Sequence, residues 1–414
     1  MHELNNHRRN AALALLAAVV LAALLSGGCG GGSAAAPAGA PDVIAPAAAA
    51  RFTALPGDGA VALSWENPAD ADFAGVVLAR ATDTFPLSPQ QGETLYAGDA
   101  RSFLDPCARH GQALYYALFA RDAAGNLSTA ATASASCAFK PFTFVAIPDT
   151  QFYSLDYPAV FNGLTQWIAD NARAWNIKIV LHEGDITHNN SNSEWANAVA
   201  AMSRLNNAVP YVLSVGNHDI TAGSTARFNA NFPYLTMKDL PGFGGVYEAG
   251  KMDNAYYLFE AGGVEWLVLS LIYNPSDAVL AWAGDMAQQY ADRRVILLTH
   301  AYLAPDGTRW SVGENIWNKF ARLHPNVTFV FNGHYTDGNA ARLASTGDAG
   351  NKVYQMFANY QTEWFGGKGQ IRLVTLDPAS ESISVKTWST LGKYYVTDSG
   401  NEFVIEDAAF GPLD

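Results

Sequence analysis

Charged side chains are scarce in this 414-residue chain, and basic ones are the scarcest. Only 15% of the residues are charged, and 25 Lys and Arg stand against 38 Asp and Glu, so the formal net charge is −13. This balance excludes a basic surface that coats nucleic acid, and it provides no long-range attraction for anionic substrates. Any affinity for an anionic group must therefore come from groups close to its binding site.

Two common motifs of phosphate and ester chemistry are also missing. The sequence contains neither a Gly-rich loop of the P-loop type nor a serine nucleophile elbow, so covalent hydrolase mechanisms have no support. The chain does contain 49% hydrophobic residues, which is enough for a large buried core. Its length predicts two domains after any leader is removed.

Cysteine occurs only three times, and the first one follows a leader-like segment. Basic residues precede an apolar run over 11–25, which is too short for a typical membrane span and typical of a signal core. Residues 25–29 read Leu-Ser-Gly-Gly-Cys and resemble a bacterial lipoprotein cleavage box, in which Cys29 would be lipidated. We therefore expect 1–29 to direct export to the periplasm, outer membrane or cell surface, with a lipid anchor at Cys29. Cleavage without lipidation and an uncleaved anchor are the alternatives.

The remaining cysteines, Cys107 and Cys137, lie in one candidate domain. An even pair in an oxidising compartment predicts a disulfide, here closing a loop of about thirty residues. Two buried free thiols are the alternative.

Composition changes twice along the chain. Residues 30–50 are mostly Gly, Ala, Pro and Ser, which predicts a flexible tether. Residues 51–138 contain short strand-like runs between turn signals, which predicts an all-β sandwich. The segment 57–68, Gly-Asp-Gly-Ala-Val-Ala-Leu-Ser-Trp-Glu-Asn-Pro, resembles the first strands of immunoglobulin-like domains of the fibronectin type III kind.

Residues 140–414 alternate between apolar runs and amphipathic stretches, which predicts a layered α/β domain. The strands expected before residue 334 are 142–147, 177–181, 211–215, 264–271, 295–298 and 327–331, and the expected helices are 158–175, 193–207, 277–292 and 313–324. Three later runs, 352–357, 370–376 and 382–388, are expected to form a second sheet.

Five polar motifs follow the ends of these strands, where open α/β sheets usually place their chemistry. They are Asp149-Thr150-Gln151, Gly184-Asp185, Gly216-Asn217-His218-Asp219, His300 and Gly333-His334-Tyr335-Thr336. Their order and spacing resemble the calcineurin-like metallophosphoesterase family, whose pattern is Asp-x-His, Gly-Asp, Gly-Asn-His-Asp or -Glu, a lone His and Gly-His-x-His. The resemblance implies a four-layer αββα sandwich that binds two divalent metal ions, such as Mn, Fe or Zn.

The family also implies a role for each motif residue. Asp185 would bridge both metals, and Asp149 and Gln151 would bind the first one. The second metal would be completed by Asn217, His300 and His334. His218 would contact the scissile phosphate, while Asp219 would orient the ring of His218.

Two positions depart from the common family pattern. Gln151 replaces the His of Asp-x-His, and Thr336 replaces the second His of Gly-His-x-His. Both changes affect the first metal, for which an amide oxygen and a hydroxyl are weaker ligands than imidazole. An exported branch of the family shares Asp-Thr-Gln, so Gln151 is expected to remain a ligand. Thr336 is the doubtful one, and a water or Asp337 could replace it.

The expected function is hydrolysis of small phosphoric esters, mono- or diesters, by a metal-activated hydroxide. The alternative is a surface or periplasmic binding protein that has kept the fold but lost catalysis. The sequence does not indicate the oligomeric state, and its only expected membrane contact is the lipid anchor.

Overall fold

The computed structural model describes residues 41–336 and 338–413. The predicted signal segment with Cys29, most of the predicted tether, and Asp337 therefore lie outside the described residues. Among the helices that are described, none is both long and apolar enough to span a bilayer.

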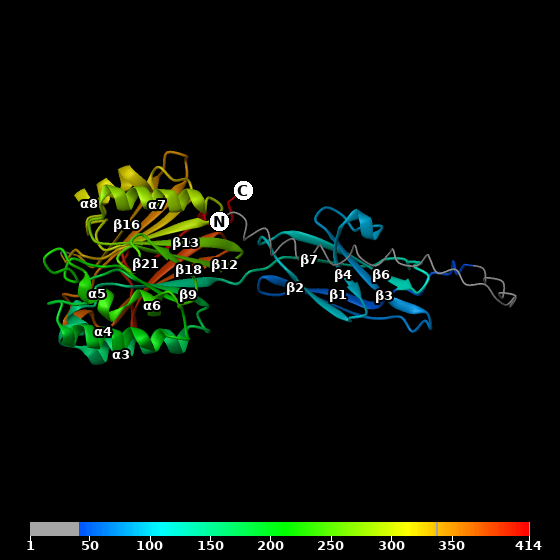
Figure 1. The fold of residues 1–414 in the computed structure, drawn as a ribbon, viewed down its shortest axis with the longest axis horizontal. Coiled ribbons are helices and arrows are strands. Elements are labelled where there is room, and N and C mark those ends of the chain that lie inside the picture. Colours follow the sequence, from blue (N-terminus) through cyan, green and yellow to red (C-terminus); the bar gives the residue numbers. More distant parts are fainter. Residues whose placement is uncertain (1–40, 337, 414) are drawn as a thin grey trace, which may run out of the picture. The chain divides into compact units, whose positions relative to one another are not determined.

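An all-β sandwich of two antiparallel sheets forms the N-terminal domain (Figure 1). One sheet has the strand order β1-β2-β5 and the other β4-β3-β6-β7. Their bounds are β1 Ala50–Pro56, β2 Ala60–Glu66, β3 Phe73–Ala81, β4 Glu93–Gly98, β5 Ser102–Pro106, β6 Ala113–Asp122 and β7 Ala131–Ser136. Side chains alternate across β2, so that Val61, Leu63 and Trp65 are buried between the sheets. This confirms the predicted all-β architecture.

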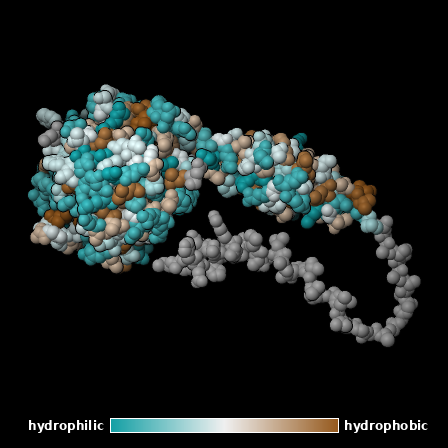
Figure 2. All heavy atoms as spheres, turned by 90° about the horizontal axis from the view of Figure 1, so that it is seen from above, coloured by the Kyte–Doolittle hydropathy of each residue, from teal (hydrophilic) through white to brown (hydrophobic). Residues whose placement is uncertain are grey.

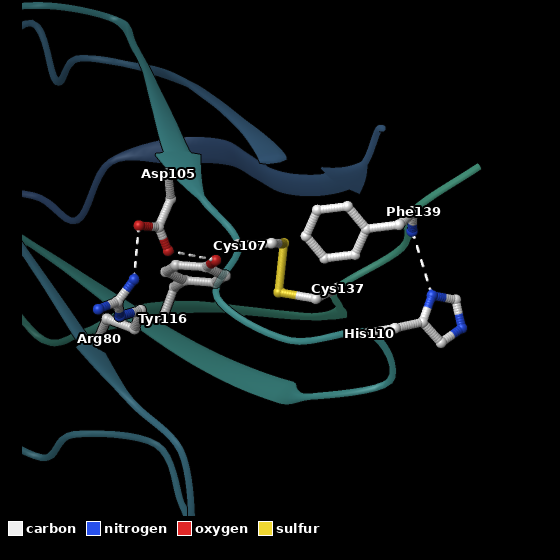
Figure 3. Close-up of a disulfide and its surroundings, with 7 residues drawn as sticks. All are labelled: Arg80, Asp105, Cys107, His110, Tyr116, Cys137 and Phe139. Atoms are coloured by element: carbon white, nitrogen blue, oxygen red, sulfur yellow. Dashed lines mark hydrogen bonds and ion pairs between the residues drawn. A yellow bond between two sulfur atoms is a disulfide. The ribbon is translucent and has the colours of Figure 1, made fainter. Parts of the chain in front are cut away.

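The loop after β5 is cross-linked to the end of β7 (Figure 3). Cys107 and Cys137 form a disulfide, as predicted, with their Cα atoms 5.6 Å apart. Next to it the buried carboxylate of Asp105 accepts hydrogen bonds from Arg80 Nη1 at 2.6 Å and from the Tyr116 hydroxyl at 2.7 Å. Burial and this carboxylate both raise the pKa of Tyr116. The polar group is buried at low cost because both carboxylate oxygens are paired.

Two mixed sheets and two layers of helices form the C-terminal domain (Figure 1). The first sheet has the order β10-β9-β8-β18-β19-β20, with β21 paired to β19. Its strands are β8 Phe142–Ile147, β9 Ile177–His182, β10 Tyr211–Leu213, β18 Gln370–Asp377, β19 Ser382–Ser389, β20 Tyr394–Val396 and β21 Glu402–Ile405. The second sheet has the order β11-β12-β13-β14-β15-β17-β16. Its strands are β11 Phe243–Val246, β12 Ala255–Ala261, β13 Val264–Leu271, β14 Arg294–Thr299, β15 Val327–Asn332, β16 Ala340–Thr346 and β17 Lys352–Ala358.

The helices lie on the outer faces of the two sheets, α3 and α4 on one side and α7 and α8 on the other (Figure 1). The described helices are α2 Gln151–Leu155, α3 Pro158–Asn171, α4 Asn192–Met202, α5 Ala226–Asn231, α6 Tyr234–Met237, α7 Asp277–Gln289, α8 Ser311–Ile316 and α9 Trp364–Gly367. Between the sheets, Phe144 of β8 packs its ring against Trp266 of β13 and Phe329 of β15. This core joins the layers, and the predicted αββα fold is confirmed.

The predicted division of strands between the sheets is wrong. We expected the three runs after residue 334 to form a sheet of their own. Instead β17 pairs with β15 and β16, whereas β18 pairs with β8 and β19. Apolar runs in the sequence indicate which strands are buried. They do not indicate which strands are neighbours in a sheet, because pairing joins segments that are far apart in the sequence.

The parallel strands place all five polar motifs at one edge of the domain. β8, β9 and β10 are parallel to one another, as are β13, β14, β15 and β17. Their carboxyl ends carry the loops that contain the motifs. In the face shown in Figure 2, hydrophobic residues form small separate groups among hydrophilic ones.

The disulfide is expected to stabilise the β-sandwich substantially. It joins residues 30 apart in sequence, and the chain-entropy argument gives about 3–4 kcal/mol for such a loop. Replacing both Cys107 and Cys137 by Ala should lower the sandwich's unfolding temperature in calorimetry of the full chain. Adding a reductant should produce the same shift in the unmodified protein and none in the double variant. The prediction would be contradicted if the reductant left the unfolding temperature of the unmodified protein unchanged.

Candidate metal centre

Five loops bring polar side chains together at the carboxyl edge of the sheets. Asp149, Asp185 and Asn217 follow β8, β9 and β10 of the first sheet. His300 and His334 follow β14 and β15 of the second sheet. Asp149, Asp185 and His300 are almost completely buried. The site therefore spans both sheets, and the sandwich of sheets must be complete before it exists.

Three potential ligand atoms converge on the Nε2 atom of His300, which is itself the fourth. This nitrogen lies 3.1 Å from Asp185 Oδ2, 3.1 Å from Asn217 Oδ1 and 3.1 Å from His334 Nδ1. The Nδ1 atom of His300 donates to the carbonyl of Glu183 at 2.9 Å, so Nε2 is the nitrogen that can bind a cation. Carboxylate, amide oxygen and imidazole groups at such distances fit a divalent metal ion.

Close backbone packing explains the two glycines that precede these ligands. A Cβ atom on Gly216 would lie 2.1 Å from Asp185 Oδ1, and one on Gly333 would lie 2.0 Å from Asp149 Oδ1. Any side chain at either position would push a buried carboxylate out of place. The glycines of the Gly-Asn-His-Asp and Gly-His motifs therefore serve ligand placement.

A second group of potential ligands surrounds Asp149. Its carboxylate accepts hydrogen bonds from the backbone N–H of His334 at 3.2 Å and from Asn359 Nδ2 at 2.9 Å. Gln151 lies beside it on the first turn of α2, and its Nε2 donates to Gln361 Oε1. The Oε1 atom of Gln151 is buried without a hydrogen-bond partner among the described residues. A buried amide oxygen without a partner is costly, so this atom fits a metal ligand.

Thr336 follows His334 by two residues and is exposed. Among the described residues no hydrogen bond joins its hydroxyl to another ligand candidate, and its role as a ligand stays a prediction. The amide side chains of Asn359 and Gln361 lie next to Asp149 and Gln151.

The role expected for Asp219 is wrong. Its two carboxylate oxygens accept hydrogen bonds from the backbone N–H groups of Ile186, Thr187 and Gly216 and from the Thr187 hydroxyl, at 2.9–3.1 Å. These bonds fasten the loop after β9 to the loop after β10, and so fix Asp185 relative to Asn217. Sequence reasoning missed this because backbone donors leave no pattern of residue types.

The ring of His218 is oriented by another histidine. Its Nδ1 lies 2.7 Å from the carbonyl oxygen of His188, and the two rings stack with centroids 5.0 Å apart. The backbone N–H of His218 donates to Asp185 Oδ1 at 2.9 Å, which places the ring next to the ligand cluster. His188 performs the positioning that was expected of Asp219.

The buried charges in the site perturb one another strongly. Burial raises the pKa of Asp149 to about 8, with a further contribution from Asp185. Burial lowers the pKa of His300, but the charges of Asp185 and Asp149 outweigh it and raise the value to about 10. Burial and the charge of His300 lower the pKa of His334 to about 4. The two carboxylates thus demand positive charge, which a proton on His300 or a metal ion can supply.

Three residues belong to this centre in addition to the ligands and catalytic residues expected from the sequence: His188, Asn359 and Gln361. Asn359 and Gln361 follow β17, whose place beside β15 was not predicted. The signal available in the sequence was the run of polar residues after a buried strand, the same signal that revealed the five motifs.

One comparison with known proteins, a family match, agrees with this geometry. The family of calcineurin-like phosphoesterases matches residues 142–335. The uncharacterized protein YvnB of Bacillus subtilis (strain 168) is 34% identical over 273 residues, which cover 63% of this chain and 21% of YvnB. The chain therefore spans about a fifth of that relative's length.

Two solved structures are similar at low sequence identity. A purple acid phosphatase, PPD1, from yellow lupin (Lupinus luteus) seeds is 14% identical with a TM-score of 0.41, over 88% of this chain and 75% of the other. The protein TT1561 of Thermus thermophilus is 13% identical with a TM-score of 0.39, over 60% of this chain and 99% of the other. Taken with the ligand geometry, the family match over 142–335 shows that this chain carries a domain of the calcineurin-like metallophosphoesterase family.

Proposed function

We propose that the domain hydrolyses small phosphoric esters at a centre of two divalent metal ions, such as Mn, Fe or Zn. The observation that carries the proposal is the convergence of Asp185, Asn217 and His334 on His300 Nε2, each at 3.1 Å. Bound ions would hold the phosphate and lower the pKa of the attacking water. Such local charge also explains how a protein with a net charge of −13 could attract a phosphate.

The ligands divide into two sets that share Asp185. Asn217, His300 and His334 complete one set, and Asp149 with Gln151 completes the other. Only two of these side chains are carboxylates, so two divalent ions would leave net positive charge for an anionic substrate. Neutral amide and imidazole ligands therefore suit a phosphate site better than further carboxylates would.

His218 is the residue proposed to act on the substrate. Its Nδ1 is paired with the His188 carbonyl, which leaves Nε2 for the phosphate or the leaving oxygen. Asp219 holds the two loops that carry the neighbouring ligands, and so acts through position alone.

A variant without the negative charge of Asp185 tests the proposed phosphoesterase activity. Asp185→Asn should lower kcat/KM by more than about 100-fold, because the shared carboxylate is lost to both ligand sets. The assay uses p-nitrophenyl phosphate and bis(p-nitrophenyl) phosphate with added Mn²⁺ or Zn²⁺, which also separates monoesterase from diesterase activity. Asp277→Asn, which alters an exposed ion pair with Lys319, is the matched control and should keep full activity. The proposal fails if neither ester is hydrolysed or if Asp185→Asn is as active as the original.

Metal content distinguishes the enzyme from a binding protein that has kept the fold. After dialysis against Zn²⁺, elemental analysis should find two ions per chain. Gln151→Ala should keep one ion, because the ligands around His300 remain, whereas His300→Ala should lose at least that ion. His110→Ala removes a histidine of the β-sandwich and should still bind two. One ion or none in the original protein would favour the binding role.

We also propose that the protein is an exported lipoprotein in which the β-sandwich, a fibronectin type III-like domain, is a spacer. The support is the Leu-Ser-Gly-Gly-Cys segment at 25–29 and the disulfide between Cys107 and Cys137. In a bacterial host fed a radiolabelled fatty acid, the full chain should incorporate label and fractionate with membranes. Cys29→Ser should abolish the label and release the protein. A labelled Cys29→Ser variant, or an unlabelled original, would refute lipidation.

A further inference from the structure

A cavity with aromatic walls lies beside the metal centre. Its volume is about 720 Å³, and it is lined by residues of α2, of the loop after α2 and of the segment around α9. Phe152, Tyr157, Trp364 and Phe365 form its aromatic lining. A volume in this range accommodates a small organic molecule, far more than a phosphate group alone needs.

Two chains of contacts connect this cavity to the metal centre. Gln361 lines the cavity and accepts a hydrogen bond from Gln151, the ligand candidate beside Asp149. Phe152 lines it too, and its ring lies 5.0 Å from that of His188, which stacks on His218. A phosphoric ester held at the metal centre could therefore extend its alcohol group into the cavity.

The aromatic residues of α9 are exposed although their backbone is firmly held. Trp364 is 78% exposed and Phe365 is 51% exposed, and Phe365 has the unfavourable left-handed φ of 57°. The segment is anchored by the ion pair between Lys368 and Glu363 at 2.7 Å, and Tyr153 OH accepts from the backbone N–H of Gly369 at 2.9 Å. Backbone strain of the kind seen at Phe365 persists only where the surrounding structure holds it, and it clusters at active sites and ligand clamps.

The glycines after Phe365 bring this segment close to α2. A Cβ on Gly366 would lie 3.0 Å from the Cβ of Phe152, and one on Gly367 would lie 2.6 Å from the hydroxyl of Tyr153. Both glycines also have positive φ, at 73° and 118°. The segment around α9 is thus packed directly against α2, and the ring of Phe365 contacts that of Tyr157 edge-on with the centroids 5.8 Å apart. A flat ligand would therefore stack on the exposed outer faces of Trp364 and Phe365 and not between the two walls.

We propose that this cavity binds the nucleoside part of a nucleotide substrate, with the base stacked on Trp364 or Phe365. The inference rests on the proposed phosphoesterase function, because the metal centre must hold the phosphate. The carboxylate of Asp156 faces the cavity without a hydrogen-bond partner among the described residues, and it can accept from an amino or hydroxyl group. The same negative charge disfavours a second phosphate there, so the neutral nucleoside is the part that enters.

Binding of adenosine tests the proposal without requiring catalysis. Calorimetry with the Zn²⁺-loaded full chain should detect adenosine, and Trp364→Ala or Phe365→Ala should weaken its binding at least about fivefold, as base stacking on aromatic side chains does. Leu323→Ala is the matched control: Leu323 is 49% exposed and precedes β15, at the opposite edge of the sheet from the site. Circular dichroism and zinc content should be unchanged in all three variants.

Hydrolysis distinguishes failure of this inference from failure of the proposed function. Adenosine 5′-monophosphate should have a higher kcat/KM than ribose 5-phosphate, which lacks the base, and Trp364→Ala should reduce this ratio while sparing ribose 5-phosphate. Equal rates for both esters, or no adenosine binding, would overturn the nucleoside site and leave phosphoesterase activity intact. Adenosine binding without hydrolysis of any phosphoric ester would support the cavity and overturn the proposed function.

Discussion

The structure of the metal centre depends on placing two carboxylates, Asp149 and Asp185, in the interior. Each is at most 2% exposed, and no Lys or Arg side chain forms an ion pair with them among the described residues. Buried charges of one sign are tolerated only when positive charge lies among them. His300 meets this demand in the protein alone, and its raised pKa is the consequence. Divalent cations bound among these groups would meet the same demand.

The fold places these groups through the contact of its two sheets. The first sheet supplies both carboxylates and Asn217, while the second supplies the two histidines. Phe144 and Trp266 pack edge to face between the sheets, with ring centroids 5.2 Å apart, and so connect the two sets of strands. Neither sheet could bind a metal ion without the other, so the hydrophobic core is a condition of the chemistry. Within the first sheet, Asp219 fixes the positions of the ligands relative to one another by joining the loops after β9 and β10.

The side of the centre around Asp149 is built differently from the side around His300. Amide side chains dominate it, with Gln151, Asn359 and Gln361 in contact with one another or with Asp149. Amides add no charge, so two cations bound here would keep their excess of positive charge over the ligands. They also lie next to the aromatic cavity, where Gln361 is a shared wall. Under the proposed function, the ligands of the metal ions and the wall of the substrate cavity would therefore share these residues.

The sequence alone determined the fold class, most strand and helix positions before residue 334, the disulfide, and the five motifs at the strand ends. These features are local: apolar periodicity, turn residues and polar groups after buried strands are visible within a few neighbouring residues. Only the tertiary structure decided that β17 joins the second sheet, and with it that Asn359 and Gln361 reach Asp149. It likewise decided that His188, through its backbone carbonyl, orients His218 in place of Asp219. The pairing of strands and the hydrogen bonds to backbone groups depend on contacts between segments that are distant in the sequence. A single amino-acid sequence does not show which distant segments come into contact.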